Sequence, residues 1–269
     1  KAPAKTELTM KRITTIITTL LLFSAATAAA QHTLGLTGGF GMSTARFYPK
    51  QETKPLWGGY NAGITWRYYG PQRFIGGFGA DLILMRQGFS FAPHPSTTEN
   101  EADYLYYTRE LNSLVLPVVW QPHFYIRHRV RVFLEAAATF SYHFGSTYAN
   151  EIDGVSGDYG FKVARDNRWG YGLAGGGGVA VLIGRFEAMV RVRYYFGFGD
   201  IVRNRNKYSG NMDDGPENPF YRTPLRSPLD NLNFSVGVAY RFNREGFDEW
   251  KTPRPKRQKN QETFNYSLD

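Results

Sequence analysis

The strongest constraint in this sequence is a period-two alternation of apolar residues with small or charged ones, repeated in several segments. Between 130 and 144 the even positions are almost all apolar, whereas the odd positions include Arg131, Glu135 and His143. Successive side chains of a β-strand point to opposite faces, so such a segment predicts a strand with one apolar and one polar face. The same alternation is present in 168–183, 185–199 and 231–242.

The whole chain shows eight segments of this kind. We predict strands at 32–42, 57–69, 73–86, 108–121, 130–144, 167–183, 185–199 and 231–242. Their connections alternate between short links at 70–72, 121–129 and 184 and long ones at 43–56, 87–107, 145–166 and 200–230. Because outer-membrane barrels have short periplasmic turns and long external loops, we predict an all-β fold. The predicted fold is an eight-stranded antiparallel transmembrane β-barrel of the outer membrane, an up-and-down meander with both mature termini in the periplasm.

A soluble β-sandwich or lipocalin-like barrel is the alternative fold, because its strands also alternate with period two. In those folds the apolar face forms the core and the polar face meets water. Here the non-apolar face is rich in Gly and Ala and carries charge only at intervals, which favours a crowded barrel interior. Aromatic residues near strand ends, among them Trp57, Trp66, Trp120 and Trp169, also favour the aromatic girdles of a membrane barrel.

Residues 10–30 have the pattern of a secretory signal peptide. Two basic residues follow Met10, an apolar run comes next, and three alanines end the segment, which predicts a mature start at Gln31. A membrane-spanning helix is the alternative, but the run is short and contains threonines. We treat residues 1–9 as upstream sequence outside the fold. A secreted chain does not meet nucleic acid, so we expect no such partner despite the formal net charge of +9.

The barrel domain is expected to span 31–242 and to continue into a flexible, basic periplasmic tail at 243–269. Residues 244–269 could dock a periplasmic protein partner or simply be disordered. The last strand carries Gly237, Tyr240 and Phe242 at a spacing that resembles the signal read by the outer-membrane assembly machinery. The partners expected are therefore that machinery and the lipid and lipopolysaccharide of the outer membrane.

Charged residues on the inward faces predict an ion-pair network inside the barrel. Side chains fill the bore of an eight-stranded barrel, and unpaired buried charge is strongly unfavourable. The predicted network consists of Asp81, Arg131, Glu135, Arg168, Glu187, Arg191, Arg193 and Arg241. It could serve as a proton or ion path or as an electrostatic plug, and we favour the plug.

Other constellations carry weaker chemical signals. Ser141 and His143 share an inward face, as a barrel hydrolase could use, but the sequence identifies no carboxylate or oxyanion partner. The acidic loop 211–217 has several oxygen ligands but lacks the spacing of calcium loops. The tyrosine-rich segment 104–107 is either an external binding patch or a continuation of the fourth strand, and we favour the strand. The chain has no cysteine, which excludes disulfides and thiolate metal sites. We expect no metal and no cofactor.

Three stretches carry a resemblance to a known family: 111–120 (LNSLVLPVVW), 193–201 (RYYFGFGDI) and 169–178 (WGYGLAGGGG). They are similar to strands of the PorT-like outer-membrane barrel family of the Bacteroidota, and the likeness covers 32–242. The resemblance implies an outer-membrane barrel, and some members of that family serve type IX secretion and gliding. Family members commonly end near the final aromatic residue, whereas this chain continues to residue 269.

The function predicted from these features is that of a non-enzymatic outer-membrane β-barrel. Such a protein would be a structural or accessory component of an envelope or secretion assembly of the type IX kind. A narrow outer-membrane channel or transporter is the second hypothesis, and an outer-membrane lipid hydrolase is the third. Conductance separates the first two hypotheses, and lipid analysis tests the third.

Overall fold

The computed structural model describes residues 31–51, 53–69, 76–91, 107–126, 129–150, 154–163, 165–203 and 224–242. The predicted signal peptide, the tail, the acidic loop 211–217 and residues 104–106 lie outside the described residues. Within the described part of the chain, no helix is long and apolar enough to cross a membrane.

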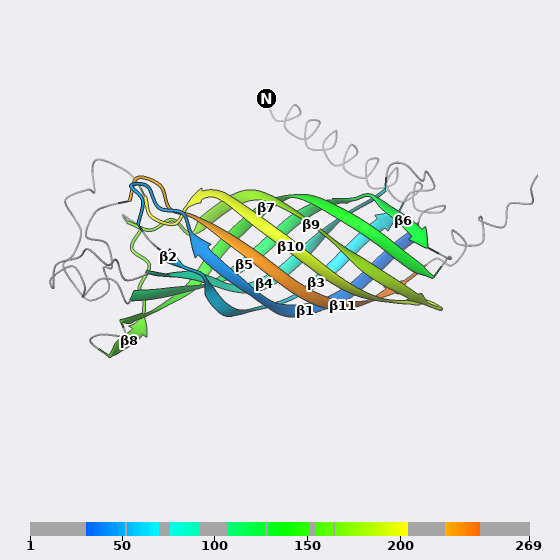
Figure 1. Cartoon of the computed structure of the whole chain (residues 1–269), viewed down its shortest axis with the longest axis horizontal. Coiled ribbons are helices and arrows are strands. Elements are labelled where there is room, and N and C mark those ends of the chain that lie inside the picture. The colour runs from blue at the N-terminus through cyan, green and yellow to red at the C-terminus, as the bar shows by residue number, and fades with distance from the viewer. Residues whose placement is uncertain are drawn as a thin grey trace, which may run out of the picture.

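Eight long antiparallel strands form the body of the molecule (Figure 1). They are β1 (Gln31–Ala45), β3 (Leu56–Tyr69), β4 (Gly77–Phe91), β5 (Tyr107–Gln121), β7 (Val130–Asn150), β9 (Trp169–Ile183), β10 (Phe186–Asp200) and β11 (Pro228–Arg241). Three short strands are attached to them: β2 (Thr53–Lys54), β6 (His123–Ile126) and β8 (Val155–Asp158). Each long strand pairs with its neighbours in chain order.

The sheet closes because the first long strand pairs with the last. β1 and β11 are in register from Thr33 opposite Arg241 to Ala45 opposite Leu229. The prediction of a closed, eight-stranded, up-and-down barrel is therefore confirmed. We call the end where β3, β5, β9 and β11 finish the turn end, and the end where β4, β7 and β10 finish the loop end, which lies to the left in Figure 1.

Several strands continue further toward the loop end than the alternation predicts. β7 was predicted to end at residue 144 but reaches Asn150. A register shift between Asn112 and Ser113 leaves Phe144 as an extra residue in β7, so Ser146 rather than Gly145 is the next buried residue. A bulge of this kind reverses the period-two pattern without ending the strand.

The turn end also differs from the prediction. β4 begins at Gly77 instead of 73, and residues 70–75 lie outside the described part of the chain. The predicted short link 121–129 contains β6, which pairs with the start of β7. The predicted tight turn at Gly184 is present, with a positive φ of 59° that suits glycine.

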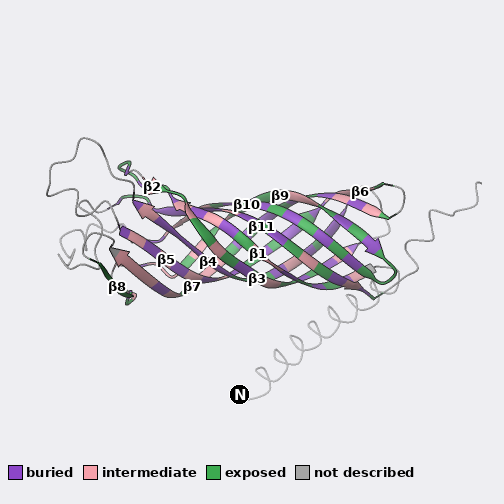
Figure 2. Ribbon diagram, turned by 60° about the horizontal axis from the view of Figure 1, so that its bottom comes forward, coloured by how far each residue is buried: buried purple, intermediate pink, exposed green. Residues whose placement is uncertain are grey.

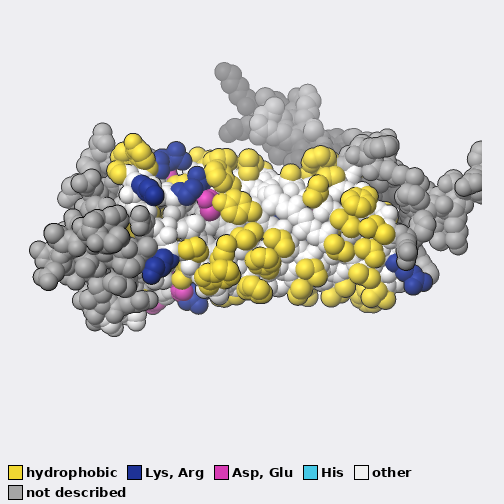
Figure 3. All heavy atoms as spheres, in the orientation of Figure 1, with side chains coloured by type: hydrophobic (Ala, Val, Ile, Leu, Met, Phe, Trp, Pro, Cys, Tyr) yellow, Lys and Arg dark blue, Asp and Glu magenta, His cyan; other side chains and the backbone are white. Residues whose placement is uncertain are grey.

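Buried and exposed residues alternate along the strands (Figure 2), and hydrophobic side chains are spread over the outer surface of the barrel (Figure 3). Outward side chains of the long strands are mostly apolar and exposed, for example Leu36 at 67%, Leu134 at 65% and Val190 at 59%. Soluble monomers rarely expose a continuous apolar surface of this extent. The apolar surface forms a broad band around the barrel, which we call the apolar band, and its composition matches a lipid-facing surface.

Side chains fill the inside of the barrel. Near the turn end a small apolar cluster contains Phe133, Ala180, Met189 and Ala239. At the loop end a larger apolar cluster, which we call the cap core, closes the bore. Its buried members are Ala45, Phe47, Phe89, Phe91, Tyr107, Leu111, Ile201, Val202 and Leu229.

Two adjacent glycines in β9 allow a test of the close packing between β9 and its neighbouring strands. A Cβ at the inward Gly176 would overlap the carbonyl oxygen of Val192, whereas a Cβ at the outward Gly175 has its nearest neighbour, the carbonyl oxygen of Glu135, at 3.9 Å. We expect Gly176→Ala to lower the free energy of unfolding by about 1–3 kcal/mol through overpacking. Gly175→Ala, the control, should change it by less than about 0.5 kcal/mol. Urea unfolding in lipid vesicles measures both, and equal effects would contradict the packing described.

Candidate functional site

Five charged side chains meet inside the barrel between the turn-end cluster and the cap core. Arg193 of β10 donates to both carboxylates, with Nη1 2.8 Å from Asp81 Oδ2 and Nη2 2.6 Å from Glu135 Oε2. Arg67 of β3 also bridges them, with Nη1 2.5 Å from Asp81 Oδ1 and Nη2 3.3 Å from Glu135 Oε1. Arg191 Nη1 lies 3.2 Å from Asp81 Oδ2. None of the five residues is more than 5% exposed. We call these five residues the central network.

Strand geometry explains why these groups converge. Arg191 and Arg193 are two residues apart on β10, so both point inward. Gly176 of β9 is paired with Arg193 on one side and with Glu135 on the other. Because Gly176 has no side chain, the two long side chains beside it have room to meet. Gly79 is paired with Arg67 in the same way, across β4 and β3.

The network holds three arginines and two carboxylates. Every carboxylate oxygen in it accepts at least one hydrogen bond from an arginine, and Gln121 Nε2 also donates to Glu135 Oε1 at 3.2 Å. Such pairing offsets the large desolvation cost of burying charge. The arrangement therefore fixes side chains across the middle of the bore.

The structure separates three of the predicted residues from the central network. Arg131 and Glu187 form their own buried ion pair nearer the turn end, with the Arg131 guanidinium 4.4 Å from the centroid of the Tyr69 ring. Arg241 donates from Nη2 to the carbonyl oxygen of Gly184. Both contacts lie on inward faces, so they fill the turn end of the bore.

Arg168 was predicted to join the network, and this placement is wrong. β9 begins at Trp169, so Arg168 precedes the alternating part of the strand and lies at the loop end. Its guanidinium lies 4.8 Å from the centroid of the Phe161 ring, and Nη1 donates to the hydroxyl of Tyr142 at 3.4 Å. The sequence analysis missed Arg67 instead, although its position between the outward Trp66 and Tyr68 would have placed it on the inward face.

A second buried arginine, also missed, anchors the segment between β8 and β9 over the loop end. Arg109 is fully buried, with Nη2 3.3 Å from Asp166 Oδ1 and its guanidinium 3.7 Å from the centroid of the Tyr159 ring. Burial raises the pKa of Tyr159 to about 12, so its hydroxyl keeps the proton that it donates to Asp166 Oδ1 at 3.2 Å. Asp166 also accepts from the Lys162 backbone N–H at 2.9 Å. The segment is thereby fixed over the mouth of the barrel.

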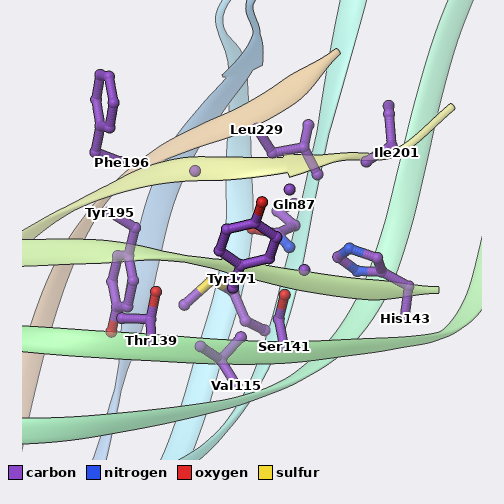
Figure 4. A pocket seen from close by; sticks show the side chains of 14 residues that line it. Gln87, Val115, Thr139, Ser141, His143, Tyr171, Tyr195, Phe196, Ile201 and Leu229 are labelled. Carbon is purple, nitrogen blue, oxygen red and sulfur yellow. The ribbon is translucent and has the colours of Figure 1, made fainter. Parts of the chain in front are cut away.

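The predicted pair Ser141 and His143 lines a small cavity beside Tyr171 and Tyr195 (Figure 4). Its volume is about 40 Å³, which is room for about one water molecule. His143 Nδ1 is 2.6 Å from the hydroxyl of Ser113, and no carboxylate is among the described residues that line the cavity. The cavity thus offers neither substrate space nor an acidic partner for the histidine.

The three predicted assembly-signal residues lie on β11 or directly after it. Gly237 faces inward, where an added Cβ would lie 2.7 Å from Thr37 Cγ2. Tyr240 and Phe242 share the outward face, with ring centroids 5.3 Å apart, and Phe242 is 54% exposed. Within the described part of the chain no group of three or more His, Cys, Asp or Glu side chains could hold a metal ion.

Comparison with known proteins identifies the family. The family model of the outer membrane protein beta-barrel domain matches residues 29–203, more than half of the chain. The chain belongs to this family. It is an outer-membrane β-barrel protein, as the alternation predicted. No curated protein matches the chain.

Solved structures similar to this outer-membrane β-barrel include three bacterial proteins. Ail, the attachment invasion locus protein of Yersinia pestis, is 15% identical to this chain. The match covers 78% of this chain and 99% of Ail, with a TM-score of 0.36. Neisserial surface protein A is 12% identical, and the match covers 79% of this chain and 99% of that protein, with a TM-score of 0.39. OprG from Pseudomonas aeruginosa is 12% identical, and the match covers 81% of this chain and 97% of OprG, with a TM-score of 0.43.

The central network makes Glu135 a sensitive position in this outer-membrane β-barrel. Glu135→Gln removes the charge that faces Arg67 and Arg193, and breaking a buried ion pair from one side is destabilising by about 3–5 kcal/mol. Glu110→Gln is the matched control, because Glu110 pairs with Arg86 and both side chains are partly exposed. Glu110→Gln should lower the free energy of unfolding by less than about 1 kcal/mol. Urea unfolding in vesicles compares the two variants, and equal losses would contradict the proposed importance of the network.

Proposed function

We propose that this protein is a closed, non-enzymatic barrel that serves as a structural or accessory component of an envelope or secretion assembly. The observation that carries this proposal is the central network, whose five buried side chains cross the bore and bond to one another. A filled bore favours a scaffold over a channel. The cavity beside Ser141 and His143 is too small and too poor in acidic groups to favour a hydrolase.

The PorT-like resemblance makes the proposal more specific. It favours a type IX-like secretion assembly in a member of the Bacteroidota. In this proposal residues 10–30 direct export, and the assembly machinery reads the segment with Gly237, Tyr240 and Phe242. The basic segment 244–269 contacts a periplasmic partner, and lipid or lipopolysaccharide surrounds the apolar band. The central network, together with the Arg131–Glu187 pair and Arg241, has a structural role as an electrostatic plug.

We also propose that the turn end faces the periplasm and the loop end faces the outside. β1 begins and β11 finishes at the turn end, so both ends of the barrel domain lie on the same side. Export through the inner membrane delivers the chain to the periplasm, and short turns face that side in outer-membrane barrels. The loop end would then carry the surfaces that are accessible from outside the cell.

Planar-bilayer conductance tests the closed bore. We expect the wild-type protein to give no large steady conductance, and such a conductance would contradict the plug. Glu135→Ala with Arg193→Ala removes two side chains from the middle of the bore and should raise the conductance. The pore should favour anions, because Arg67 and Arg191 would then face only Asp81.

The control for this experiment is Arg86→Ala with Glu110→Ala. It deletes a charge pair of the same kind that lies partly exposed instead of buried in the bore. We expect this variant to remain as closed as the wild-type protein. An increase of similar size in both double variants would assign the effect to general loosening of the barrel.

Cysteine labelling in intact cells tests the orientation. The chain has no cysteine, so Asp158→Cys in β8 at the loop end and Arg185→Cys at the turn end each give a single thiol. Both native side chains are exposed. A maleimide that does not cross membranes should label the Asp158→Cys protein on whole cells and the Arg185→Cys protein only after lysis. The opposite pattern would overturn the proposed orientation.

A further inference from the structure

An open groove lies on the outside of the loop end where β9, β10 and the segment before β11 meet. Its volume is about 600 Å³, within the range of about 300–1,000 Å³ that small-molecule sites usually have. The lining residues that matter below are Asn167, Tyr171, Phe198, Asp200, Arg203 and Arg226. We call this feature the rim groove.

Two arginines and one aspartate give the rim groove a net positive charge. Arg226 is held in place, because its Nε lies 3.1 Å from each oxygen of Asp200 and its Nη2 donates to the carbonyl oxygen of Phe198 at 3.2 Å. The side chain of Arg203 makes no hydrogen bond or ion pair with any described residue. A guanidinium without a partner among the described residues suits an anion, for which phosphate has matching geometry.

The rim groove also borders the apolar band. Tyr171 is 60% exposed and Phe198 is 37% exposed, and their ring centroids are 6.4 Å apart. Asn167 accepts from the Trp169 backbone N–H through Oδ1, which leaves its amide NH₂ without a described partner. Figure 3 shows basic side chains, with acidic ones among them, at the loop-end edge of the apolar band. Cationic, amide and aromatic groups thus meet at the level where lipid headgroups would lie.

We propose that the rim groove binds the phosphorylated sugar headgroup of an outer-leaflet glycolipid. Arg203, with Arg226 beside it, pairs with the phosphate, and Asn167 and Asp200 are placed to bond sugar hydroxyls. Tyr171 and Phe198 contact the start of the acyl chains. A lipid fits this site better than a soluble ligand, because the groove continues directly into the apolar band. The inference rests on the proposed orientation, which places the loop end in the outer leaflet.

Binding to lipid A in detergent micelles tests this proposal on the full chain. Bisphosphorylated lipid A is titrated into the protein, and the complex is quantified by native mass spectrometry. Arg203→Gln should raise the Kd about tenfold, because one charge-assisted bidentate contact is lost. Arg203 has no side-chain bond to other described residues, so the substitution should leave folding intact, which heat-modifiable migration on gels verifies.

Arg185→Gln is the matched control. It removes an exposed arginine at the turn end that donates to the hydroxyl of Tyr240, far from the rim groove, and should leave the Kd unchanged. Lipid A without phosphates should bind the wild-type protein at least as weakly as bisphosphorylated lipid A binds the Arg203→Gln variant, because Arg226 also loses its contact with the phosphate. Equal binding by Arg203→Gln and wild type, or equal binding of both lipid A forms, would overturn the proposal.

Two further outcomes have defined meanings. If soluble glucosamine 1-phosphate competes as well as lipid A at equal concentration, a free phosphosugar is the ligand and the lipid assignment is wrong. The micelle titration does not depend on orientation. If Arg203→Gln binds lipid A as tightly as the wild-type protein while the cysteine labelling gives the expected pattern, only this inference is wrong. If the labelling pattern is reversed, the proposed orientation is wrong, and with it the placement of the rim groove in the outer leaflet.

Discussion

The rest of the structure depends on the closure of one sheet in a surrounding that cannot hydrogen-bond. A backbone N–H or C=O that faces hydrocarbon must find its partner within the protein, so the edge of β1 has to pair with the edge of β11. Closure with only eight strands makes the bore narrow. Long side chains on the inward faces must then pack against one another, and every charge among them needs a partner close by.

The same arrangement of residues therefore fits the narrow bore and gives each buried charge a partner. The glycine-rich part of β9 places Gly176 and Gly178 beside Glu135, Arg191 and Arg193, so small residues alternate with long charged ones around the wall. The ion pairs fix the middle of the bore, and the cap core with Arg109 closes the loop end. The parts that remain for interaction are the outside of the loop end, the apolar band and the turn end.

The alternation of residue types was enough to predict the eight strands and to assign Asp81, Glu135, Arg191 and Arg193 to the inward face. It could not tell which of these groups meet, because contacts across the bore depend on strand stagger. It failed where a bulge or a strand end interrupts the period, as at Phe144 and Arg168. The contact between Arg109 and Asp166 joins residues 57 apart through a segment with no periodicity, so no local pattern predicts it.

The central claim is that one face of each strand meets hydrocarbon while the other is buried and packed inside the barrel. Neighbouring positions in β1 test it most directly, because Leu36 is 67% exposed and Thr37 is 7% exposed. A single cysteine at each position is treated in vesicles with a hydrocarbon-soluble and with a water-soluble thiol reagent. The account predicts that the cysteine at 36 reacts with the hydrocarbon-soluble reagent alone and that the cysteine at 37 reacts with neither. Reaction of the cysteine at 36 with the water-soluble reagent alone would contradict it.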